Sequence, residues 1–354
     1  NASKAGNVPD AGRAAGTRRA PATSGYWRLV WGQFRRRRTN RAALGVVLAL
    51  AALALVADFL AASQPILLSF RGRFYFLPNV FFYPGLQIYD NALLQRVMGP
   101  GDWAVLPLVP WGYNNHDLCS VLVGPSSLHW LGTDTSGRDV AARVIHGSRV
   151  SLGVGVLASL VSTGIGIAVG SVAGYYGGRL DGMLMRVVEV VNSLPGLLIL
   201  VTMLSILAPE GWGSVLSMSF VIGLVGWTTV ARLMRGEILR VKTLDFVQAS
   251  RAQGASNLRV IAVHVIPNSM SPVLVAATFS MAHAVLLEGG LSFLGFGIPS
   301  DMASWGGLLK QGYGNWEAWW LTAFPGLAVF VAVLVYNLAG EGLRDAMDPR
   351  LKRV

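Results

Sequence analysis

The sequence predicts an all-α membrane protein with six transmembrane helices, and its composition is the first reason. Hydrophobic residues make up 53% of the 354 residues and charged residues only 13%, whereas a soluble domain usually carries about 25% charged residues. A transmembrane helix needs about 20 apolar residues, and six runs of the sequence meet that length. They lie near residues 42–62, 151–174, 187–207, 213–230, 267–287 and 318–338, with the fourth extending toward Gly236.

Positive charge predicts how the chain is oriented in the membrane. Most of the 29 Lys and Arg residues fall in the two terminal tails and in the loop 237–267, and cytoplasmic segments of membrane proteins are enriched in these residues. We therefore expect both termini and this loop to be cytoplasmic. Because the Arg35–Arg38 run adjoins the first span, the net charge of +11 indicates topology and not nucleic-acid binding.

The predicted spans divide the chain into five parts. The long segment between the first two spans is rich in aromatic residues such as Phe74, Phe76 and Phe82. We expect these side chains to form the core of a small outer cap, and favour this over contact with a peptide or a partner protein. The parts are a basic cytoplasmic tail with an interfacial helix (1–41), the first transmembrane helix (42–62), an enlarged outer, periplasmic segment (63–149), a core of five transmembrane helices (150–340) and a cytoplasmic tail (341–354).

The loop 237–267 is the longest polar interruption in the apolar second half of the chain, and it predicts two short helices joined by a tight turn. We expect Asp245 to cap the first helix, with Gln248 reaching back to it, and Gly254 to supply a left-handed C-cap. Ser256 is expected to cap the second helix, which runs on to Pro267. Small residues at the exposed tip allow another surface to approach closely; they are Ala249, Ser250, Ala252, Gly254 and Ala255.

This loop resembles the EAA loop of ABC-importer permeases, which forms the coupling helix that contacts the ATPase subunit. Gly254 and Pro267 stand at the spacing of the family pattern. Gln248 replaces the Glu of that pattern, Ser250 its second Ala and His264 its Ile. The resemblance implies a coupling helix over residues 245–255. The implied ATPase-coupling residues are Asp245, Gln248, Ala249, Ser250, Arg251, Gly254 and Ala255.

A second motif, LGTDTSGRD at residues 131–139, ends the outer segment. It resembles the long signature of the C-type subunit of dipeptide, oligopeptide and nickel permeases, as do EGGLSFLGFG at 288–297 and GEGLRDAMDP at 340–349. We expect Arg138 and Asp139 to form a structural ion pair instead of contacting a substrate. The residues of this outer signature are Gly132, Thr133, Asp134, Gly137, Arg138 and Asp139.

The enlarged outer segment is similar to that of the permease subgroup that imports peptide-like antibiotics such as microcin C. The resemblance implies a permease subunit of an ATP-driven importer of oligopeptides or peptide-like compounds. Its implied partners are a second permease subunit, two ATP-binding subunits, a soluble periplasmic substrate-binding protein and membrane lipid, but no nucleic acid. The sequence has no GxxxxGK[ST] phosphate loop, so we expect this chain not to hydrolyse ATP in the P-loop manner and not to be an enzyme. The resemblance implies ATP and Mg²⁺ on partner subunits and a location in a bacterial inner membrane.

Three residues within the apolar runs are candidates for translocation or gating. Pro195 is expected to kink the third span. His283 and Glu288 are ionisable groups near membrane depth, where a functional role is the default hypothesis. They stand five residues apart in the sequence, a poor match to one helix face, so we predict no metal site. We expect Glu288 to bond backbone donors where the helix breaks at Gly289 and Gly290.

Two other patterns concern packing. Gly166, Gly170 and Gly174 recur on one face of the second span, which predicts close approach of another helix. Trp305 and Trp316 are expected to anchor an outer loop at the membrane interface.

Other functions stay open at this point. A nickel or metal-chelate permease shares these motifs. A secondary transporter driven by an ion gradient would carry charged sites at the midplane, often with inverted repeats, and no repeat is visible. An intramembrane enzyme would need paired acid, base or metal ligands within the spans, where Asp58, Glu189, His283 and Glu288 are scattered. The sequence does not give the transported molecule, its path, whether the partner permease is a distinct chain, the effect of Gln248 or the true N-terminus.

Overall fold

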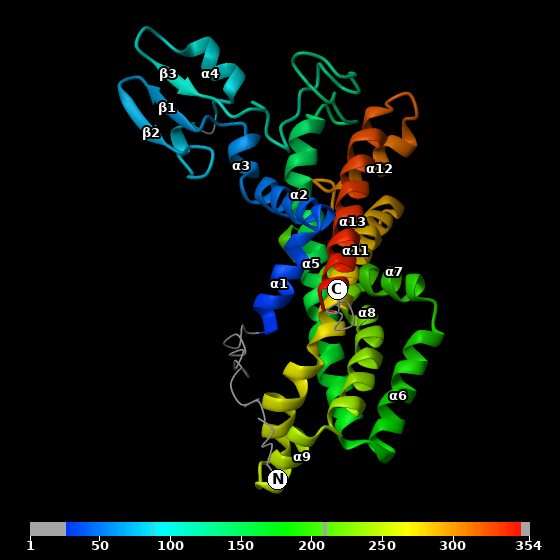
Figure 1. The fold of residues 1–354 in the computed structure, drawn as a ribbon. Helices are drawn as coiled ribbons and strands as arrows, with labels where there is room; N and C mark the ends of the chain where they lie inside the picture. Colours follow the sequence, from blue (N-terminus) through cyan, green and yellow to red (C-terminus); the bar gives the residue numbers. More distant parts are fainter. Residues whose placement is uncertain (1–25, 87, 208–210, 348–354) are drawn as a thin grey trace, which may run out of the picture.

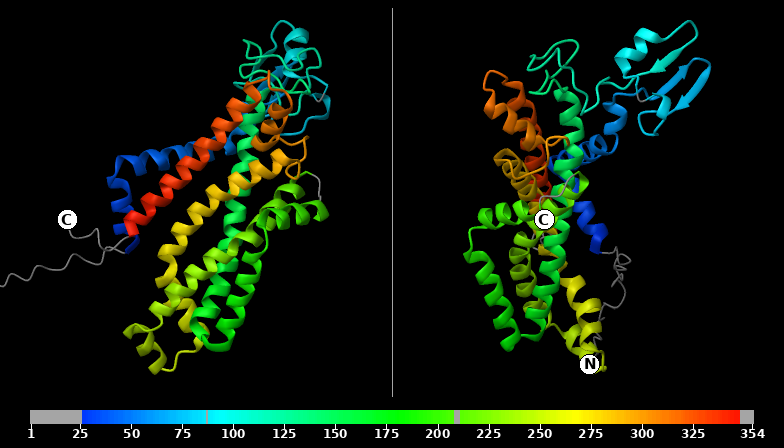
Figure 2. Two further views of the ribbon diagram at one scale, coloured as in Figure 1. Left: turned by 90° about the vertical axis from the view of Figure 1, so that its right-hand side faces the viewer. Right: turned by 180° about the vertical axis from the view of Figure 1, so that it is seen from behind.

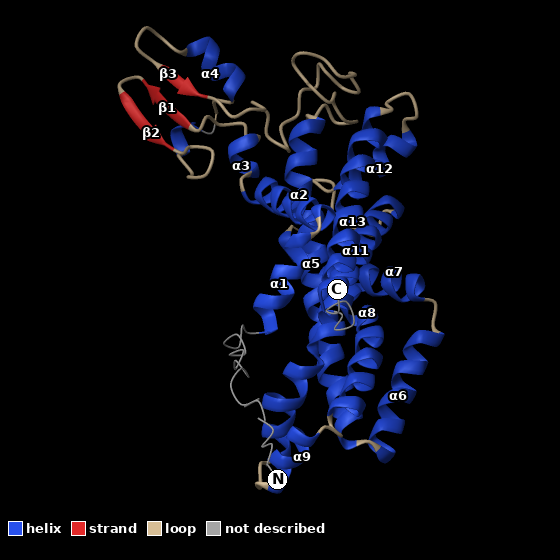
Figure 3. Cartoon of the chain, in the orientation of Figure 1, coloured by secondary structure: helices blue, strands red, loops and turns tan. Residues whose placement is uncertain are grey.

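The structure is a computed structural model that describes residues 26–86, 88–207 and 211–347. Most of the long helices form one upright bundle, with a small sheet at one end and the short helix α9 (Asp245–Ala252) at the other, and α7 (Gly196–Leu207) lies across the upright helices (Figure 1, Figure 3). Residues 1–25 and 348–354, the outer ends of the two expected tails, lie outside the described residues. The long helices are α1 (Tyr26–Arg36), α2 (Arg38–Leu55), α5 (Val140–Tyr176), α6 (Gly178–Ser193), α7 (Gly196–Leu207), α8 (Trp212–Val241), α11 (Ile266–Leu294) and α13 (Trp320–Met347).

Among the described residues, five helices are long and apolar enough to cross a membrane, and α6 with α7 forms a sixth span only as a pair bent by 85°. The expected single helix over 187–207 is therefore wrong. Leu194 adopts an extended backbone (φ −85°, ψ 141°), as the residue before a proline prefers. Pro195 also has no N–H to continue the helical hydrogen bonds, so it breaks the helix instead of only kinking it.

Several helices extend beyond the apolar runs that predict them. α5 begins at Val140, well before the expected residue 151, because the Asp139 side chain accepts a hydrogen bond from the Ala142 amide and caps the helix there. α13 continues to Met347, so residues 341–347 of the expected tail are helical. α2 stops at Leu55, and the short helix α3 (Ala57–Leu60) follows it. Hydropathy locates the membrane-buried part of a helix but not the polar turns that lengthen it.

The glycine row of α5 packs directly against α8. A Cβ on Gly166 would lie 2.5 Å from the Val230 Cβ, and one on Gly170 would lie 2.5 Å from the Ala231 carbonyl oxygen. The predicted close approach along this face is confirmed. Since no side chain larger than hydrogen fits at these positions, the glycines set the distance between the two helices.

The segment after α9 forms one long helix up to Leu294. The expected helix end at Pro267 and the expected helix break at Gly289 and Gly290 are therefore wrong. The α10 helix (Asn257–Arg259) and the π-helical segment η2 (Val260–Val265) continue without interruption into α11. Pro267 lies in the first turn of α11. It has no N–H to bond the preceding turn, and the wider π-helical turns of η2 come directly before it. α11 also continues through Gly289 and Gly290 and ends at Leu294, where Gly295 caps it in a left-handed conformation.

The outer segment contains a three-stranded antiparallel sheet of order β2-β1-β3. The strands are β1 (Leu67–Phe70), β2 (Arg73–Phe76) and β3 (Trp103–Val105), with the short helices η1 (Pro84–Leu86) and α4 (Asn91–Val97). The expectation that the aromatic residues form the cap's own core is partly wrong: Phe70, Tyr75, Tyr83 and Tyr89 join one cluster, but the side chains of Phe74, Phe76, Phe81 and Phe82 are exposed.

The helix α1 and the short helix α12 complete the bundle. Val30 and Phe34 of α1 pack against Ala346 and Met347 at the end of α13, so the first and last described helices lie beside each other (Figure 2). The interfacial anchor expected at Trp305 is wrong, because this side chain is buried at the start of α12 (Trp305–Gly314), where its indole donates to the Val144 carbonyl oxygen. Trp316 is exposed.

Candidate functional site

The helix α9 (Asp245–Ala252) lies at the end of the bundle opposite the sheet (Figure 1). The expected capping box is wrong. Leu244 occupies the N-cap position without a side-chain hydrogen bond, so Asp245 is the first helical residue. Its charge still favours the positive end of the helix dipole. The Gln248 side chain donates to the Lys242 carbonyl oxygen at 2.9 Å instead of reaching back to Asp245.

The end of α9 is closed by a Schellman motif. Gly254 adopts a left-handed backbone (φ 79°) and its amide bonds the Arg251 carbonyl oxygen at 2.9 Å. The Ala255 amide bonds the Ser250 carbonyl oxygen at 3.2 Å, which is the second bond of the motif. The predicted left-handed cap at Gly254 is confirmed. Ser256 caps the next helix as expected, since its hydroxyl accepts from the Arg259 amide.

One face of α9 and its turn is exposed, where the small residues Ala249, Ala252 and Gly254 lie among larger side chains. Val247 is buried and joins the cluster formed by the ends of α5, α8 and α11, whereas Gln248, Ala249 and Arg251 are exposed. A small, rigidly capped surface at the end of a bundle suits close packing of another protein.

α9 is fastened to the end of α5 by polar contacts. The Arg251 guanidinium lies 4.7 Å from the centre of the Tyr175 ring, a distance typical of cation–π attraction. The Tyr175 hydroxyl donates to the Asn257 side-chain oxygen at 2.9 Å. The Lys242 ammonium donates to the Gly174 carbonyl oxygen at 2.7 Å. These contacts join the α9 turn to the last turn of α5.

A cavity of about 1320 Å³ opens along α5, α8 and α11. Hydroxyl and amide groups line much of its wall, and Thr228 donates to the Asn192 side-chain oxygen there at 2.9 Å. Sequence reasoning missed these residues, although each is a polar side chain within an apolar run. The polar lining residues of the membrane-spanning helices include Ser159, Ser162, Asn192, Thr228, Thr229, Asn268 and His283.

The three candidate gating residues lie in different places. His283 lines the cavity. Pro195 lies at the break between α6 and α7. Glu288 is fully buried, and its carboxylate accepts hydrogen bonds from the hydroxyls of Ser151 and Ser292 at 2.7 and 2.9 Å. The expected bonds of Glu288 to free backbone donors are wrong because the helix does not break beside it. No group of three or more His, Cys, Asp or Glu suited to a metal is present in the described part of the chain.

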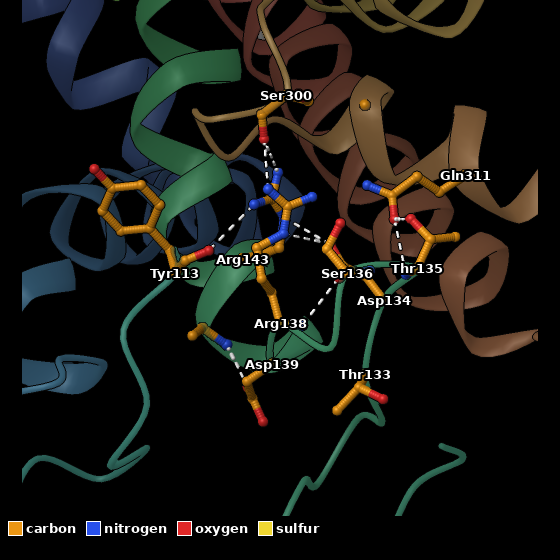
Figure 4. A network of polar contacts seen from close by, with 12 residues as sticks. Tyr113, Thr133, Asp134, Thr135, Ser136, Arg138, Asp139, Arg143, Ser300 and Gln311 are labelled. Atoms are coloured by element: carbon orange, nitrogen blue, oxygen red, sulfur yellow. Dashed lines mark hydrogen bonds and ion pairs between the residues drawn. The ribbon is translucent and has the colours of Figure 1, made fainter. Parts of the chain in front are cut away.

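The outer signature forms a hydrogen-bonded clamp between α5 and the segment before α12 (Figure 4). The Asp134 carboxylate accepts from the Arg138 side chain at 2.8 Å and from the Ser136 amide at 2.8 Å. Arg138 and Arg143 both donate to the Ser300 carbonyl oxygen, at 2.7 and 3.3 Å. Thr135 adds a hydroxyl hydrogen bond to the side chain of Gln311 on α12 at 2.9 Å.

The expected ion pair between Arg138 and Asp139 is wrong, because each has another partner. Arg138 pairs with Asp134, while Asp139 caps α5 and lies 2.9 Å from the Nδ1 atom of His129. Burial raises the pKa of the Asp139 carboxyl, and the hydrogen bonds from Ala142 and His129 oppose this shift.

Two glycines make the backbone of the clamp possible. A Cβ on Gly137 (φ 71°) would lie 2.0 Å from the Asp117 carbonyl oxygen, and one on Gly132 (φ 79°) would lie 2.8 Å from the Trp320 indole nitrogen. Trp320 in turn donates to the Thr133 carbonyl oxygen at 3.0 Å. The motif therefore joins the start of α5 to α12 and α13.

Comparison with known proteins matches most of the chain. Residues 166–353 match the family model described as the binding-protein-dependent transport system inner membrane component, and residues 25–74 match the N-terminal transmembrane domain of oligopeptide transport permease C. The chain is similar to the dipeptide transport system permease protein DppC of Bacillus subtilis, with 39% identity over 76% of this chain and 82% of that protein. Its identity to the oligopeptide transport system permease protein OppC of the same organism is 34%, over 69% of this chain and 79% of that protein.

Proposed function

This chain belongs to the family of binding-protein-dependent transport system inner membrane components, and on that premise we propose that it is the permease subunit of an ATP-driven importer of oligopeptides or peptide-like compounds. Similar proteins are named as dipeptide and oligopeptide transport permeases, in agreement with the C-type resemblance of its motifs. The observation that carries the mechanism is α9, an exposed, rigidly capped helix fastened to α5. The finer resemblance to the microcin C subgroup stays a prediction.

In this mechanism α9 is the coupling helix. Two partner subunits bind ATP and Mg²⁺ and close on each other, and the small surface around Ala249 and Gly254 seats in one of them. Their movement passes through Arg251 and Tyr175 to α5, and the bundle rocks as a rigid body against a second permease subunit. This chain performs no bond-making chemistry.

The cavity is proposed to form this subunit's half of the translocation path, and the second permease subunit would form the other half. Its wall offers uncharged donors and acceptors such as Ser159, Asn192 and Thr228, which can exchange hydrogen bonds with a peptide backbone whatever its side chains. His283 is an ionisable group in this wall, and Glu237, Arg240 and Arg344 also line the cavity. A soluble binding protein delivers the substrate on the side of the sheet, which we place in the periplasm, and both termini and α9 face the cytoplasm of a bacterial cell.

The test is affinity purification of this subunit from native membranes, followed by mass spectrometry and reconstitution in liposomes. We expect a P-loop ATPase, a second permease and a peptide-binding protein to co-purify, and ATP-dependent uptake of a labelled peptide. A co-purified protein that binds nickel chelates instead would support the metal-permease alternative. Uptake by the chain alone, without ATP, would overturn the proposal.

A further inference from the structure

The sheet domain exposes an apolar loop that its own fold does not use. Between Arg73 and Asp90 the sequence contains no charged residue, and the loop after β2 turns three large apolar side chains outward. Val80, Phe81 and Phe82 are exposed, Phe82 by 73%. Contiguous exposed apolar groups of this kind mark a surface that contacts lipid or protein.

The loop is tied to the end of the first span. The Asn79 side chain donates to the Asp58 carbonyl oxygen at 2.8 Å, and Asp58 itself pairs with Arg149 of α5 at 2.9 Å. Arg149 also donates to the Ala54 carbonyl oxygen in the last turn of α2 at 3.0 Å. A charged pair at the end of an apolar helix marks where the chain leaves the hydrocarbon, so the tether holds the loop at that boundary.

The exposed side chains of the loop have apolar counterparts on the neighbouring helices. Leu55 and Val56 at the end of α2 and Phe59 on α3 are also exposed large apolar residues. In Figure 1 the sheet domain lies beside α3, at the end of the bundle away from α9. If a bilayer surrounds the end of α2, it lies beside this loop as well.

The backbone of the loop is also suited to lipid. The amides of Val80 and Phe81 both bond the Leu77 carbonyl oxygen, at 3.0 and 2.8 Å. Backbone groups that enter an apolar phase need such internal partners, because no water replaces them. The Tyr83 hydroxyl donates to the Phe76 carbonyl oxygen at 3.1 Å and closes the base of the loop on β2.

We propose that Val80–Phe82 is a membrane anchor, in which Phe81 and Phe82 insert into the headgroup and acyl boundary of the leaflet on the side of the sheet. Aromatic and apolar side chains favour this boundary, and the Asn79 tether fixes their depth. The anchor holds the sheet domain against the bilayer beside the first span. This assignment depends only on the chain crossing a membrane and not on the transported substrate.

The test compares two fluorescent labels in the intact transporter reconstituted in lipid vesicles. One NBD label is placed at position 82 by Phe82→Cys in a Cys119→Ser background. The control label is on the native Cys119, which is exposed and lies in the loop before α5. Quenching by doxyl-labelled lipids reports contact with the bilayer, and quenching by iodide reports contact with water. Phe81→Cys serves as a second site if Phe82→Cys does not assemble.

We expect doxyl lipids to quench the label at position 82 several-fold more than the label at Cys119, and iodide to show the opposite order. Asn79→Ala is expected to lower the lipid quenching at position 82, because it removes the tether. A label at position 82 that iodide quenches as strongly as at Cys119 would overturn the anchor. A label protected from both quenchers would also overturn it, and would assign the loop to a protein partner.

Discussion

At the scale of single residues, Gly254 decides the shape of the α9 turn. Its left-handed backbone closes the Schellman motif, and no atom lies within 4 Å of the position a Cβ would take. The left-handed backbone conformation, and not the space around it, therefore limits which residues fit at position 254. A left-handed conformation costs an ordinary side chain about 1–2 kcal/mol, whereas Asn adopts it more readily.

Gly254→Arg is expected to abolish ATP-dependent uptake while the protein still inserts into the membrane. The change strains the turn and places a large charged side chain on the small surface that we assign to the ATPase contact. Peptide uptake and membrane content are measured together. Gly254→Asn is the matched control and is expected to keep most of the uptake. Normal uptake by Gly254→Arg would refute the coupling assignment.

Arg143 shows a second kind of single-residue effect, because it is buried and its guanidinium donates to three carbonyl oxygens, those of Tyr113, Ser300 and Met302. Arg143→Met is expected to lower the free energy of unfolding by about 3–5 kcal/mol, since the carbonyl oxygens of Tyr113 and Met302 lose this donor and Asp134 keeps only one of its two arginine neighbours. Arg186→Met, at an exposed pair with Glu189, is expected to cost about 0–1 kcal/mol. Thermal unfolding in detergent compares the two, and equal midpoints would contradict the clamp.

At the scale of elements, the pairing of α5 with α8 organises the bundle. Gly166, Gly170 and Gly174 place one helix backbone directly against the other, and Gly223 of α8 returns the contact, since its Cβ would lie 2.6 Å from the Val161 Cβ. Helices in a membrane associate through such close packing, because apolar surface alone gives no preference for protein over lipid.

Gly170→Ala is expected to destabilise this pair by about 1–3 kcal/mol, the usual cost of overpacking. The added methyl group would lie 2.5 Å from the Ala231 carbonyl oxygen. Gly164→Ala on the same helix is the control, because nothing lies within 4 Å of its Cβ position. The unfolding temperature of each variant in detergent gives the comparison. Helix propensity alone would make both Ala variants more stable, so a Gly164→Ala protein as unstable as Gly170→Ala would contradict packing against α8 as the cause.

At the scale of the whole molecule, α9 and the cavity are joined through α5. The Arg251 and Tyr175 contact lies at one end of α5, Ser159 and Ser162 line the cavity farther along it, and the outer signature clamps its start. A single helix of 37 residues thus links the proposed ATPase contact, the proposed path and the clamp.

Arg251→Ala is expected to separate ATP hydrolysis from transport. The reconstituted complex should still hydrolyse ATP, but substrate and binding protein should stimulate hydrolysis less, and uptake per ATP should fall several-fold. Tyr175→Phe keeps the aromatic ring under Arg251 and loses only the hydroxyl bond to Asn257, so a smaller loss is expected. Unchanged uptake per ATP in Arg251→Ala would show that movement does not pass through this contact.

The sequence by itself determined the helical membrane class, the approximate spans, the left-handed Gly254 and the close packing at Gly166 and Gly170. Each of these depends on local properties, such as the length of an apolar run or the spacing of small residues along one helix. The break at Pro195 was located correctly, but its size was not, because a bend angle depends on what the two halves pack against.

Only the tertiary structure decided which polar groups meet. Asp134 and not Asp139 pairs with Arg138, and Glu288 bonds Ser151, a residue far away in the sequence. It also decided that Trp305 is buried and that the polar groups of three helices face one cavity. Spacing along the chain cannot give these results, because the partner of a buried polar group is the donor or acceptor that packing brings within about 3 Å of it.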